Sequence, residues 1–363
     1  MNLPWLPSTF LSLFIIKVLV ALAVVVITFH ALSLHPGIRN ATHFNHSPSP
    51  RPQFRKGGNC LPQYSLDILN DLKAWQSSCG LPKSHHPPQW RVTTATAHFG
   101  KVEEHYQKAL QTHVLHTMLH QTRLEVMCTP IIDSLWNKPA FLLSMLLGEM
   151  LKEPEERTEW IFWVDRDTII LDECRPATSF LPPRPLDAGG EIRGQTGDDD
   201  VQLIVTNDWN GLNNGVFLVR VGQWAIELFS AILAFRHYRP DVNLPFTEQS
   251  AMEIVMREPR FNKSVQLVPQ TWFNTYPGGN ASTFLDRDDE DGLADYQVRR
   301  GDFLIHFAGV SNRDRSLNDW TAMLGIMPKV WEEWRLQRNV TAGIDAFWKK
   351  MELEKTDNSS AEE

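Results

Sequence analysis

The chain is poor in cysteine and has no cluster of basic residues, and both features narrow the class of protein. Its four cysteines include no Cys-x-x-Cys pair, so a zinc site built on closely spaced thiolates is not expected. The formal net charge is -8, and the sequence contains no long basic run and no platform of interleaved basic and aromatic residues. The sequence therefore gives no support for binding to nucleic acid. It shows no internal repeat either.

Hydrophobic residues are abundant enough for one large folded domain. They make up 42% of the 363 residues, with 13 Trp and 19 Phe, a composition that excludes a disordered chain. The even number of cysteines allows one or two disulfides, and Cys60 with Cys79 is the local candidate pair. Four buried free thiols, including Cys128 and Cys174, are the alternative.

Residues 10–29 form an apolar run that is interrupted only by Lys17. At 1.5 Å per residue, a helix over this run spans about 30 Å, the thickness of a bilayer core. We expect residues 1–9 to be a cytoplasmic tail and residues 10–29 to be a transmembrane signal-anchor. A cleaved signal peptide is the alternative, because Ala31-Leu32-Ser33 resembles a cleavage site.

Glycosylation sequons favour a lumenal position for everything that follows this run. Asn-x-Ser/Thr begins at Asn40, Asn45, Asn262, Asn280, Asn339 and Asn358, all after the apolar run. The positive-inside rule points the other way, because basic residues are more frequent after the run than before it. We give the sequons more weight and expect a single-pass type II membrane protein.

Composition divides the rest of the chain into three parts. Residues 30–89 are rich in Pro, Ser, Asn and His over their first half and are expected to form an extended stem region. Residues 90–325 alternate short apolar segments with helical periods, which is typical of an α/β catalytic domain. Residues 326–363 are expected to form a C-terminal helix, over 328–354, and a polar tail.

The alternation predicts individual elements, parallel at first and mixed later. Strands are expected at Val92–Ala97, Leu124–Cys128, Trp160–Val164, Gln202–Thr206, Val216–Val219, Val265–Val268 and Phe303–Phe307. Helices are expected at Glu103–His120, Lys138–Lys152, Gln223–Arg236 and Glu248–Arg257. In the first helix, His113, His116 and His120 share one arc opposite several apolar residues, so we expect a solvated face rather than a zinc site.

Two carboxylates one residue apart follow the most apolar of these strands. Asp165-Arg166-Asp167 lies between Trp160–Val164 and a second apolar run, at the end of a strand where a parallel sheet opens its ligand crevice. Two hard oxygen ligands this close can hold Mn2+ or Mg2+ and leave positions for phosphate oxygens. The alternative is a solvated turn after a strand, since Asp-x-Asp also begins at Asp198, Asp286 and Asp289.

Two further segments carry polar groups beside apolar strands. Residues 207–215 crowd amides and glycines before a strand, which suits a polyhydroxylated ligand but equally suits a hairpin turn. His306 lies in the apolar run Phe303–Phe307. It is either an ordinary core residue or a third metal ligand, because imidazole binds Mn2+ acceptably.

In order and spacing, these segments resemble the fungal galactosyltransferase and mannosyltransferase family that also includes the plant xyloglucan xylosyltransferases. The resemblance runs from about residue 91 to residue 320 and rests on Trp136–Leu143, Trp160–Leu171, Asp208–Arg220, Glu248–Ala251, Val268–Gln270 and His306–Gly309. It implies a GT-A (Rossmann-like) α/β fold, a mixed sheet flanked by helices, preceded by one transmembrane helix and a stem.

The resemblance also implies an activity and a location. The protein would be a retaining, metal-dependent hexosyltransferase that moves galactose or mannose from a UDP- or GDP-sugar to a glycan or glycoprotein acceptor and forms an α bond. It would lie in the Golgi membrane with its catalytic domain in the lumen, bind Mn2+ with Mg2+ as the alternative, and have a transferase complex as a further partner.

The same resemblance assigns residues to roles. The metal ligands would be Asp165, Asp167 and His306; the catalytic residues Glu248, Gln249 and Asn213; and the donor-binding residues Asp165, Asp167, Gly215, Arg313 and Lys138. Ser311 stands where plant members carry a diphosphate-binding lysine, and Arg313 would substitute for it. Same-face attack is favoured over a nucleophilic role for Glu248.

Two alternative functions follow from particular residues of this chain. Asn213–Phe217 also resembles the turn of glycogenin-like retaining transferases, which would share the fold and the metal. The bulky Arg166 and the missing lysine suggest the other alternative, a catalytically silent lumenal protein that binds glycans or serves as a scaffold.

Overall fold

The computed structural model describes residues 53–55, 60–61, 72, 75–79, 90–184, 200–287, 292–327, 338 and 340–361. All of them belong to one compact unit, residues 48–363. The expected signal-anchor at 10–29 lies outside the described residues. Within the described part of the chain, no helix combines the length and the apolar character needed to cross a membrane.

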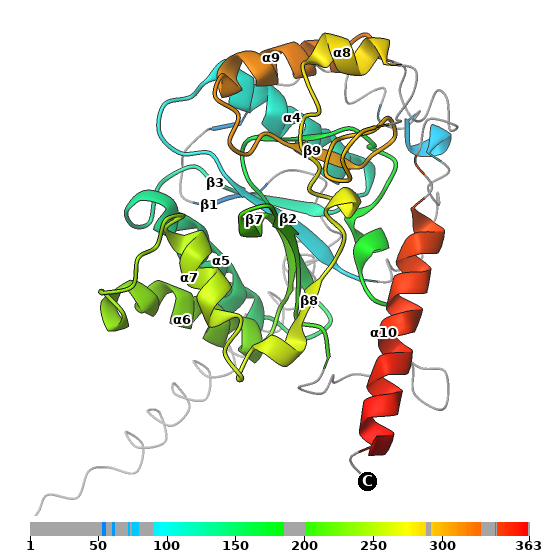
Figure 1. Cartoon of the computed structure of the whole chain (residues 1–363). Coiled ribbons are helices and arrows are strands. Elements are labelled where there is room, and N and C mark those ends of the chain that lie inside the picture. Colours follow the sequence, from blue (N-terminus) through cyan, green and yellow to red (C-terminus); the bar gives the residue numbers. More distant parts are fainter. Residues whose placement is uncertain are drawn as a thin grey trace, which may run out of the picture. The chain divides into compact units, whose positions relative to one another are not determined.

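A seven-stranded mixed sheet lies at the centre of this unit (Figure 1). In spatial order its strands are β1 (Gln53–Arg55), β3 (Arg123–Met127), β2 (Val92–Ala97), β4 (Trp160–Val164), β7 (Gly211–Arg220), β6 (Leu203–Asp208) and β8 (Val265–Leu267). The first four are parallel to one another, β7 is antiparallel to β4 and to β6, and β8 is parallel to β6. The predicted mixed α/β sheet is confirmed. β1 lies in the range expected as stem.

The helices and a small second sheet cover the two faces. The helices are α4 (Glu104–Leu119), α5 (Asn137–Met150), α6 (Gln223–Tyr238), α7 (Glu248–Val255), α8 (Ala281–Asp286), α9 (Arg313–Leu324) and α10 (Thr341–Ala361). β5 (Thr168–Ile170) and β9 (Leu304–His306) form an antiparallel pair. α10 begins at Thr341, within the helix expected over 328–354, and residues 328–337 of that helix lie outside the described chain.

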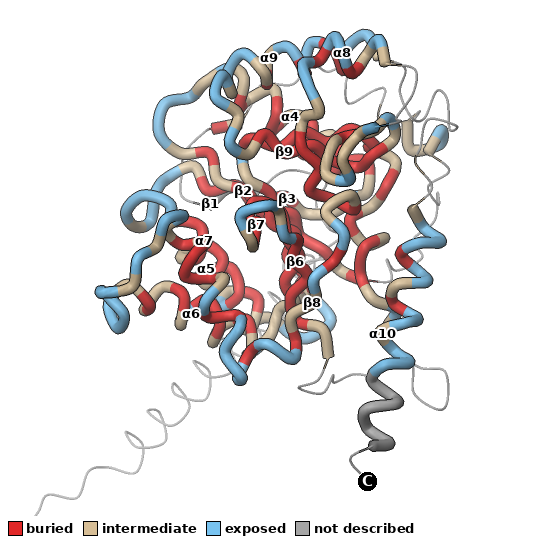
Figure 2. The backbone as a smooth tube through the Cα atoms, viewed as in Figure 1, coloured by how far each residue is buried: buried red, intermediate tan, exposed pale blue. Residues whose placement is uncertain are grey.

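Both faces of β4 are buried, which explains its uninterrupted apolar sequence. Ile161 and Trp163 belong to the hydrophobic cluster formed with α5, α6 and α7, which lie together on one side of the sheet (Figure 1). Phe162 points to the opposite side, where it packs with Phe273 and Phe303. Figure 2 shows burial along the inner strands and exposure over the outer turns of α8 and α9.

The expectation that three histidines of α4 face solvent is wrong. His113 and His116 are each 3% exposed, because the chain that follows β4 crosses this side of the helix. Their ring Nε2 atoms lie 2.8 Å from Thr168 Oγ1 and from the Arg175 carbonyl oxygen, respectively, and His120 Nε2 donates to the Glu173 carbonyl oxygen. The helix is therefore covered on both sides, and the polar arc is satisfied by internal hydrogen bonds.

The expected pairing of Cys60 with Cys79 is also wrong. The structure joins Cys60 to Cys128 and Cys79 to Cys174. The first bond follows from the sheet, because β1 runs parallel to β3 and pairs Arg55 with Met127. Cys128 is the residue after Met127, and Cys60 is five residues after Arg55, so the two cysteines follow neighbouring parallel strands.

Candidate active site

The Asp165-Arg166-Asp167 segment forms the corner between the main sheet and the small β5-β9 sheet. β4 ends at Val164, and the Asp165 N–H donates to the Gly215 carbonyl oxygen at 2.7 Å, which fixes the start of the corner on β7. Asp165 is half-buried and Asp167 is buried. Arg166 is exposed, and its guanidinium lies over the Tyr106 ring, 4.0 Å from the centroid. The basic side chain thus packs on an aromatic ring, and Arg166 belongs to the lining of the same cavity as the two aspartates.

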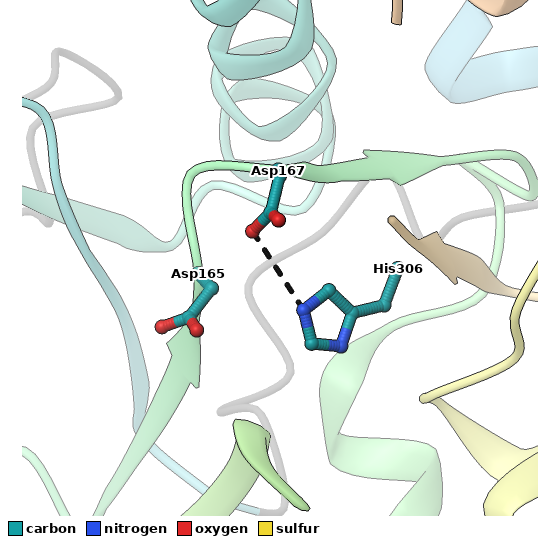
Figure 3. Close-up of side chains that lie close together, drawn as sticks. All are labelled: Asp165, Asp167 and His306. Atoms are coloured by element: carbon teal, nitrogen blue, oxygen red, sulfur yellow. Dashed lines mark ion pairs between the residues drawn. The ribbon is translucent and has the colours of Figure 1, made fainter. Parts of the chain in front are cut away.

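His306 reaches the two carboxylates from β9. The pairing of β9 with β5 places His306 opposite Thr168, one residue after Asp167. One ligand atom from each of Asp165, Asp167 and His306 lies within 4.8 Å of the others, and His306 Nε2 is 3.6 Å from Asp167 Oδ1 (Figure 3). His306 is 3% exposed, so it is both a core residue and a neighbour of the carboxylates.

Asn274 fixes the orientation of the His306 ring. His306 Nδ1 is 2.9 Å from Asn274 Oδ1. The Asn274 amide nitrogen donates to Thr206 Oγ1 at 2.7 Å and to Asn213 Oδ1 at 3.1 Å, so both of its hydrogens are used. Its Oδ1 can only accept, which requires the proton of the neutral imidazole to sit on Nδ1. The Nε2 lone pair is then left on the side of Asp167.

Two cations lie against the carboxylates. Lys138, in the first turn of α5, places Nζ 3.0 Å from Asp165 Oδ1, 2.9 Å from Asn214 Oδ1 and 3.5 Å from Glu248 Oε1. Burial alone would lower the pKa of Lys138, but Asp165 and Glu248 outweigh burial and raise that pKa. The ammonium group therefore remains charged within the site.

Arg313 makes the second cation contact. Its Nε lies 3.0 Å from Asp167 Oδ2 in an ion pair, although without hydrogen-bond alignment. Burial of Asp167 opposes ionisation, but Arg313 and, when its Nε2 carries a proton, His306 hold the pKa of this carboxyl well below its usual range. Asp167 is thus a carboxylate at neutral pH.

Glu248 begins α7 and faces the same site. It is 3% exposed, and its Oε2 has no hydrogen-bond partner among the described residues. Burial raises the pKa of Glu248, Lys138 opposes this effect, and Asp165 adds to it. The preceding Thr247 has a φ of 53°, a strained conformation for a β-branched residue at the entry into this helix.

The amides after β6 belong to a hairpin, so the hairpin alternative is confirmed. β6 and β7 pair up to Asp208 and Gly211, which leaves Trp209-Asn210 as a two-residue turn. Asn213 uses its Oδ1 for the Gly215 N–H and for Asn274, and its Nδ2 for Asp208 and the Tyr276 hydroxyl. These contacts give Asn213 a scaffold function, and its role at a sugar stays a prediction.

One cavity of about 610 Å³ collects all the residues singled out from the sequence. It is lined by Asp165, Asp167, His306, Glu248, Gln249, Asn213, Gly215, Arg313 and Lys138. The structure therefore brings these residues together, while their individual roles stay predictions. It adds Trp209, Tyr276 and Phe246 to the lining and Asn274 behind it. No motif in the sequence distinguishes Asn274 from an ordinary loop asparagine.

The donor set fits a hard or borderline divalent cation. It offers carboxylate oxygens from Asp165 and Asp167 and an imidazole nitrogen whose lone pair is left free by the bond to Asn274. Gly215 makes room for that imidazole, because a Cβ at this residue would lie 2.1 Å from His306 Cε1. The residues around the site are thus consistent with Mn2+ or Mg2+.

Comparison with known proteins finds galactosyltransferases and a mannosyltransferase among the relatives of this chain. An alpha-1,2-galactosyltransferase of Schizosaccharomyces pombe is 27% identical over 203 residues, 47% of this chain and 46% of that protein. The probable alpha-1,6-mannosyltransferase MNN10 of Saccharomyces cerevisiae is 22% identical over 169 residues, 42% of this chain and 41% of that protein. The chain spans about half the length of the curated relatives it matches.

A solved glycosyltransferase involved in the glycosylation of the major capsid of PBCV-1 is 17% identical, with a TM-score of 0.44 over 62% of this chain and 98% of that one. The family model that matches is described as the galactosyl transferase GMA12/MNN10 family, and the match runs over residues 105–316. That range is more than half of the chain and contains every residue predicted for the site. The chain belongs to the galactosyl transferase GMA12/MNN10 family.

Proposed function

We propose that this protein is a retaining glycosyltransferase of the GT-A fold that transfers a hexose, galactose or mannose, from a nucleotide-sugar to a glycan acceptor. The observation that carries the proposal is the convergence of Asp165, Asp167 and His306 within 4.8 Å, at the carboxyl end of β4 and in a cavity large enough for a donor. Family membership and relatives named for galactosyl and mannosyl transfer support the sugar class.

Asp165, Asp167 and His306 would hold a divalent cation, Mn2+ or Mg2+. When bound, such an ion supplies positive charge against the departing diphosphate. The protein adds to that charge. Arg313, at the start of α9 and half exposed, is placed to bind the diphosphate oxygens and to stabilise the negative charge that develops on them. This contact would take the place of the lysine found in plant relatives.

Glu248 and Gln249 are proposed to act on the sugar. The transferred sugar gains positive charge as its anomeric bond breaks, and the buried Glu248 carboxylate, with one oxygen unpartnered, can stabilise that charge. Gln249 Oε1 accepts the Asn214 N–H at 3.1 Å, which leaves its amide nitrogen for a sugar hydroxyl. We propose same-face attack, in which an oxygen of the leaving diphosphate takes the acceptor proton and configuration is retained.

A lumenal Golgi location is proposed with the activity. The apolar run at 10–29 would anchor the chain, and six sequons follow it. Among the described sequons, Asn262 and Asn280 are both exposed, so a glycosylating enzyme could reach them. An endoglycosidase-sensitive gel shift of the full chain expressed in a eukaryotic host would support lumenal residence, and an unshifted band would count against it.

The activity is tested by a donor screen. The full chain in detergent is incubated with UDP-galactose, UDP-glucose, UDP-xylose and GDP-mannose in the presence of Mn2+, and released nucleotide is measured. We expect one donor to be turned over and Asp167→Asn to lower that turnover at least about a hundredfold. Asp319→Asn, an exposed carboxylate on α9 outside the cavity, is the matched control. Donor binding without turnover would instead identify a silent glycan-binding protein.

A further inference from the structure

Trp209 is an exposed tryptophan at the mouth of the cavity. Its relative exposure is 65%, although tryptophan is mostly buried in folded proteins. It lines the cavity together with Asp208, Asn210 and Phe246. An exposed aromatic ring next to a polar cavity is a feature that recognises a ligand with one apolar face and several hydroxyls.

The indole is held in place although it is exposed. It makes edge contacts with the rings of Tyr276 and Tyr296, with centroids 5.2 Å apart in each case. The backbone beneath it is a tight hairpin turn in which the Asn210 N–H donates to Asp208 Oδ1 at 2.6 Å. The Tyr276 hydroxyl donates to Asp208 Oδ2, also at 2.6 Å. Because the ring is already held in place, little conformational entropy is lost when a ligand binds to it.

The sheet order places Trp209 on the far side of the metal site from the expected nucleotide. The parallel strands β2 and β4 end at the cavity with Ala97 and Asp165, and parallel strands bind nucleotides beyond such carboxyl ends. β7 follows β4 in the sheet, and β6, whose end carries Trp209, follows β7. A nucleotide-sugar bound in this way would have its sugar between the nucleotide and Trp209.

We propose that Trp209 is the platform of the acceptor subsite, where its exposed face stacks against a pyranose ring of the glycan acceptor. Such a ring presents C–H groups on one face and hydroxyls around its edge, and Asn210, exposed beside Trp209, can bind the hydroxyls. The inference rests on the proposed function. It further assigns selection of the acceptor to the wall of the cavity that carries Trp209, and it names a pyranose ring as the chemical group that this wall binds.

The test measures sugar binding directly. Saturation-transfer NMR is recorded with methyl α-D-mannopyranoside and methyl α-D-galactopyranoside on the full chain in detergent, with Mn2+ and UDP or GDP present. Trp209→Ala and Trp209→Leu remove the aromatic face, and Trp209→Tyr retains one. Tyr238→Ala is the matched control, because Tyr238 is an 81% exposed aromatic outside the cavity. Nucleotide affinity is measured in parallel by calorimetry.

We expect Trp209→Ala and Trp209→Leu to weaken sugar binding at least about tenfold, with nucleotide affinity changed less than about twofold, and Trp209→Tyr to stay close to wild type. Unchanged sugar binding in both variants would overturn the proposal. So would a parallel loss of nucleotide binding, since Trp209 would then serve the donor. Because this comparison does not use turnover, a wild-type protein inactive on every donor would count against the proposed function and not against the platform.

Discussion

Gly215 and His306 are packed so closely that residue 215 cannot carry a side chain without displacing the imidazole. A Cβ at this position would lie 2.1 Å from His306 Cε1 and 2.8 Å from Nε2. Gly215 lies on β7 directly beside Asp165, and its carbonyl oxygen accepts the Asp165 N–H. One glycine therefore sets the distance between the strand that carries the carboxylates and the histidine that faces them.

Gly215→Ala should therefore weaken Mn2+ binding by roughly 10- to 100-fold, the range seen when groups that orient metal ligands are changed. Calorimetric titration with Mn2+ measures this directly. Gly222→Ala is the matched control, because its Cβ would meet nothing within 4 Å and its φ of 176° suits any residue. Equal Mn2+ affinity in Gly215→Ala and wild type would refute the assignment of His306 as a ligand.

Asn274→Leu should lower Mn2+ affinity by a similar factor although Asn274 is not a ligand. The change leaves His306 Nδ1 without its acceptor, so the ring loses the bond that selects its tautomer. It also removes the donor to Thr206 Oγ1 and one of the two donors to Asn213 Oδ1, at a cost of about 1 to 3 kcal/mol in unfolding free energy. Asn274→Asp keeps the acceptor oxygen and should recover part of the affinity. If Leu and Asp variants bind Mn2+ equally, Asn274 serves the fold alone.

The elements of this fold are predictable from the sequence because local patterns determine them. The strands Val92–Ala97 and Trp160–Val164 are found with the expected bounds. The first is rich in β-branched Val and Thr, which favour strands, and the second is the continuous apolar run that burial of both faces imposes. The two aspartates are recognisable because they interrupt such a run at its end. These features can be predicted from the residues next to them in the sequence alone.

Features that depend on distant contacts are not predictable in the same way. The histidine-bearing side of α4 has the polar sequence of a solvent-exposed face. It is buried because residues 168–175, which are distant in sequence, pack against it. The Cys60–Cys128 disulfide follows the pairing of β1 with β3, and Cys79–Cys174 joins residues 95 apart in the sequence. Asn274 acquires its position from partners on β6, β7 and β9, so no pattern around it could reveal a function.

The buried histidines of α4 predict a loss of stability in mild acid. Burial lowers the pKa of His113 and of His120 to about 4 and holds the pKa of His116 well below its usual value. In the unfolded chain they titrate near 6.5. Between these values the unfolded state binds more protons, so the unfolding free energy falls as pH drops from about 6.5 to 4 and is unaffected by these groups above about 7.

At pH 5.5 His113 and His120 should each lower the unfolding free energy by roughly 1 kcal/mol, and His116 acts in the same direction. Denaturant unfolding of the full chain at pH 7.5 and 5.5 measures the difference. His116→Gln keeps a nitrogen that can donate to the Arg175 carbonyl but cannot take up a proton, so its pH dependence should be smaller than that of wild type. The same slope in both proteins would show that His116 titrates normally.

Arg313 can be separated from a merely structural arginine by comparison with its neighbour on α9. Arg313 lines the cavity and pairs with Asp167, whereas the side chain of Arg315 is 82% exposed and pairs with Asp319 outside the cavity. Arg313→Gln removes the positive charge expected at the leaving diphosphate, so turnover of the donor found in the screen should fall roughly 10- to 1,000-fold. Arg313→Lys keeps the charge and should retain a larger share of the activity.

Arg315→Gln should match wild type in turnover, and melting temperatures of all variants check the fold. A Gln variant at 313 as active as the one at 315 would remove Arg313 from the donor site.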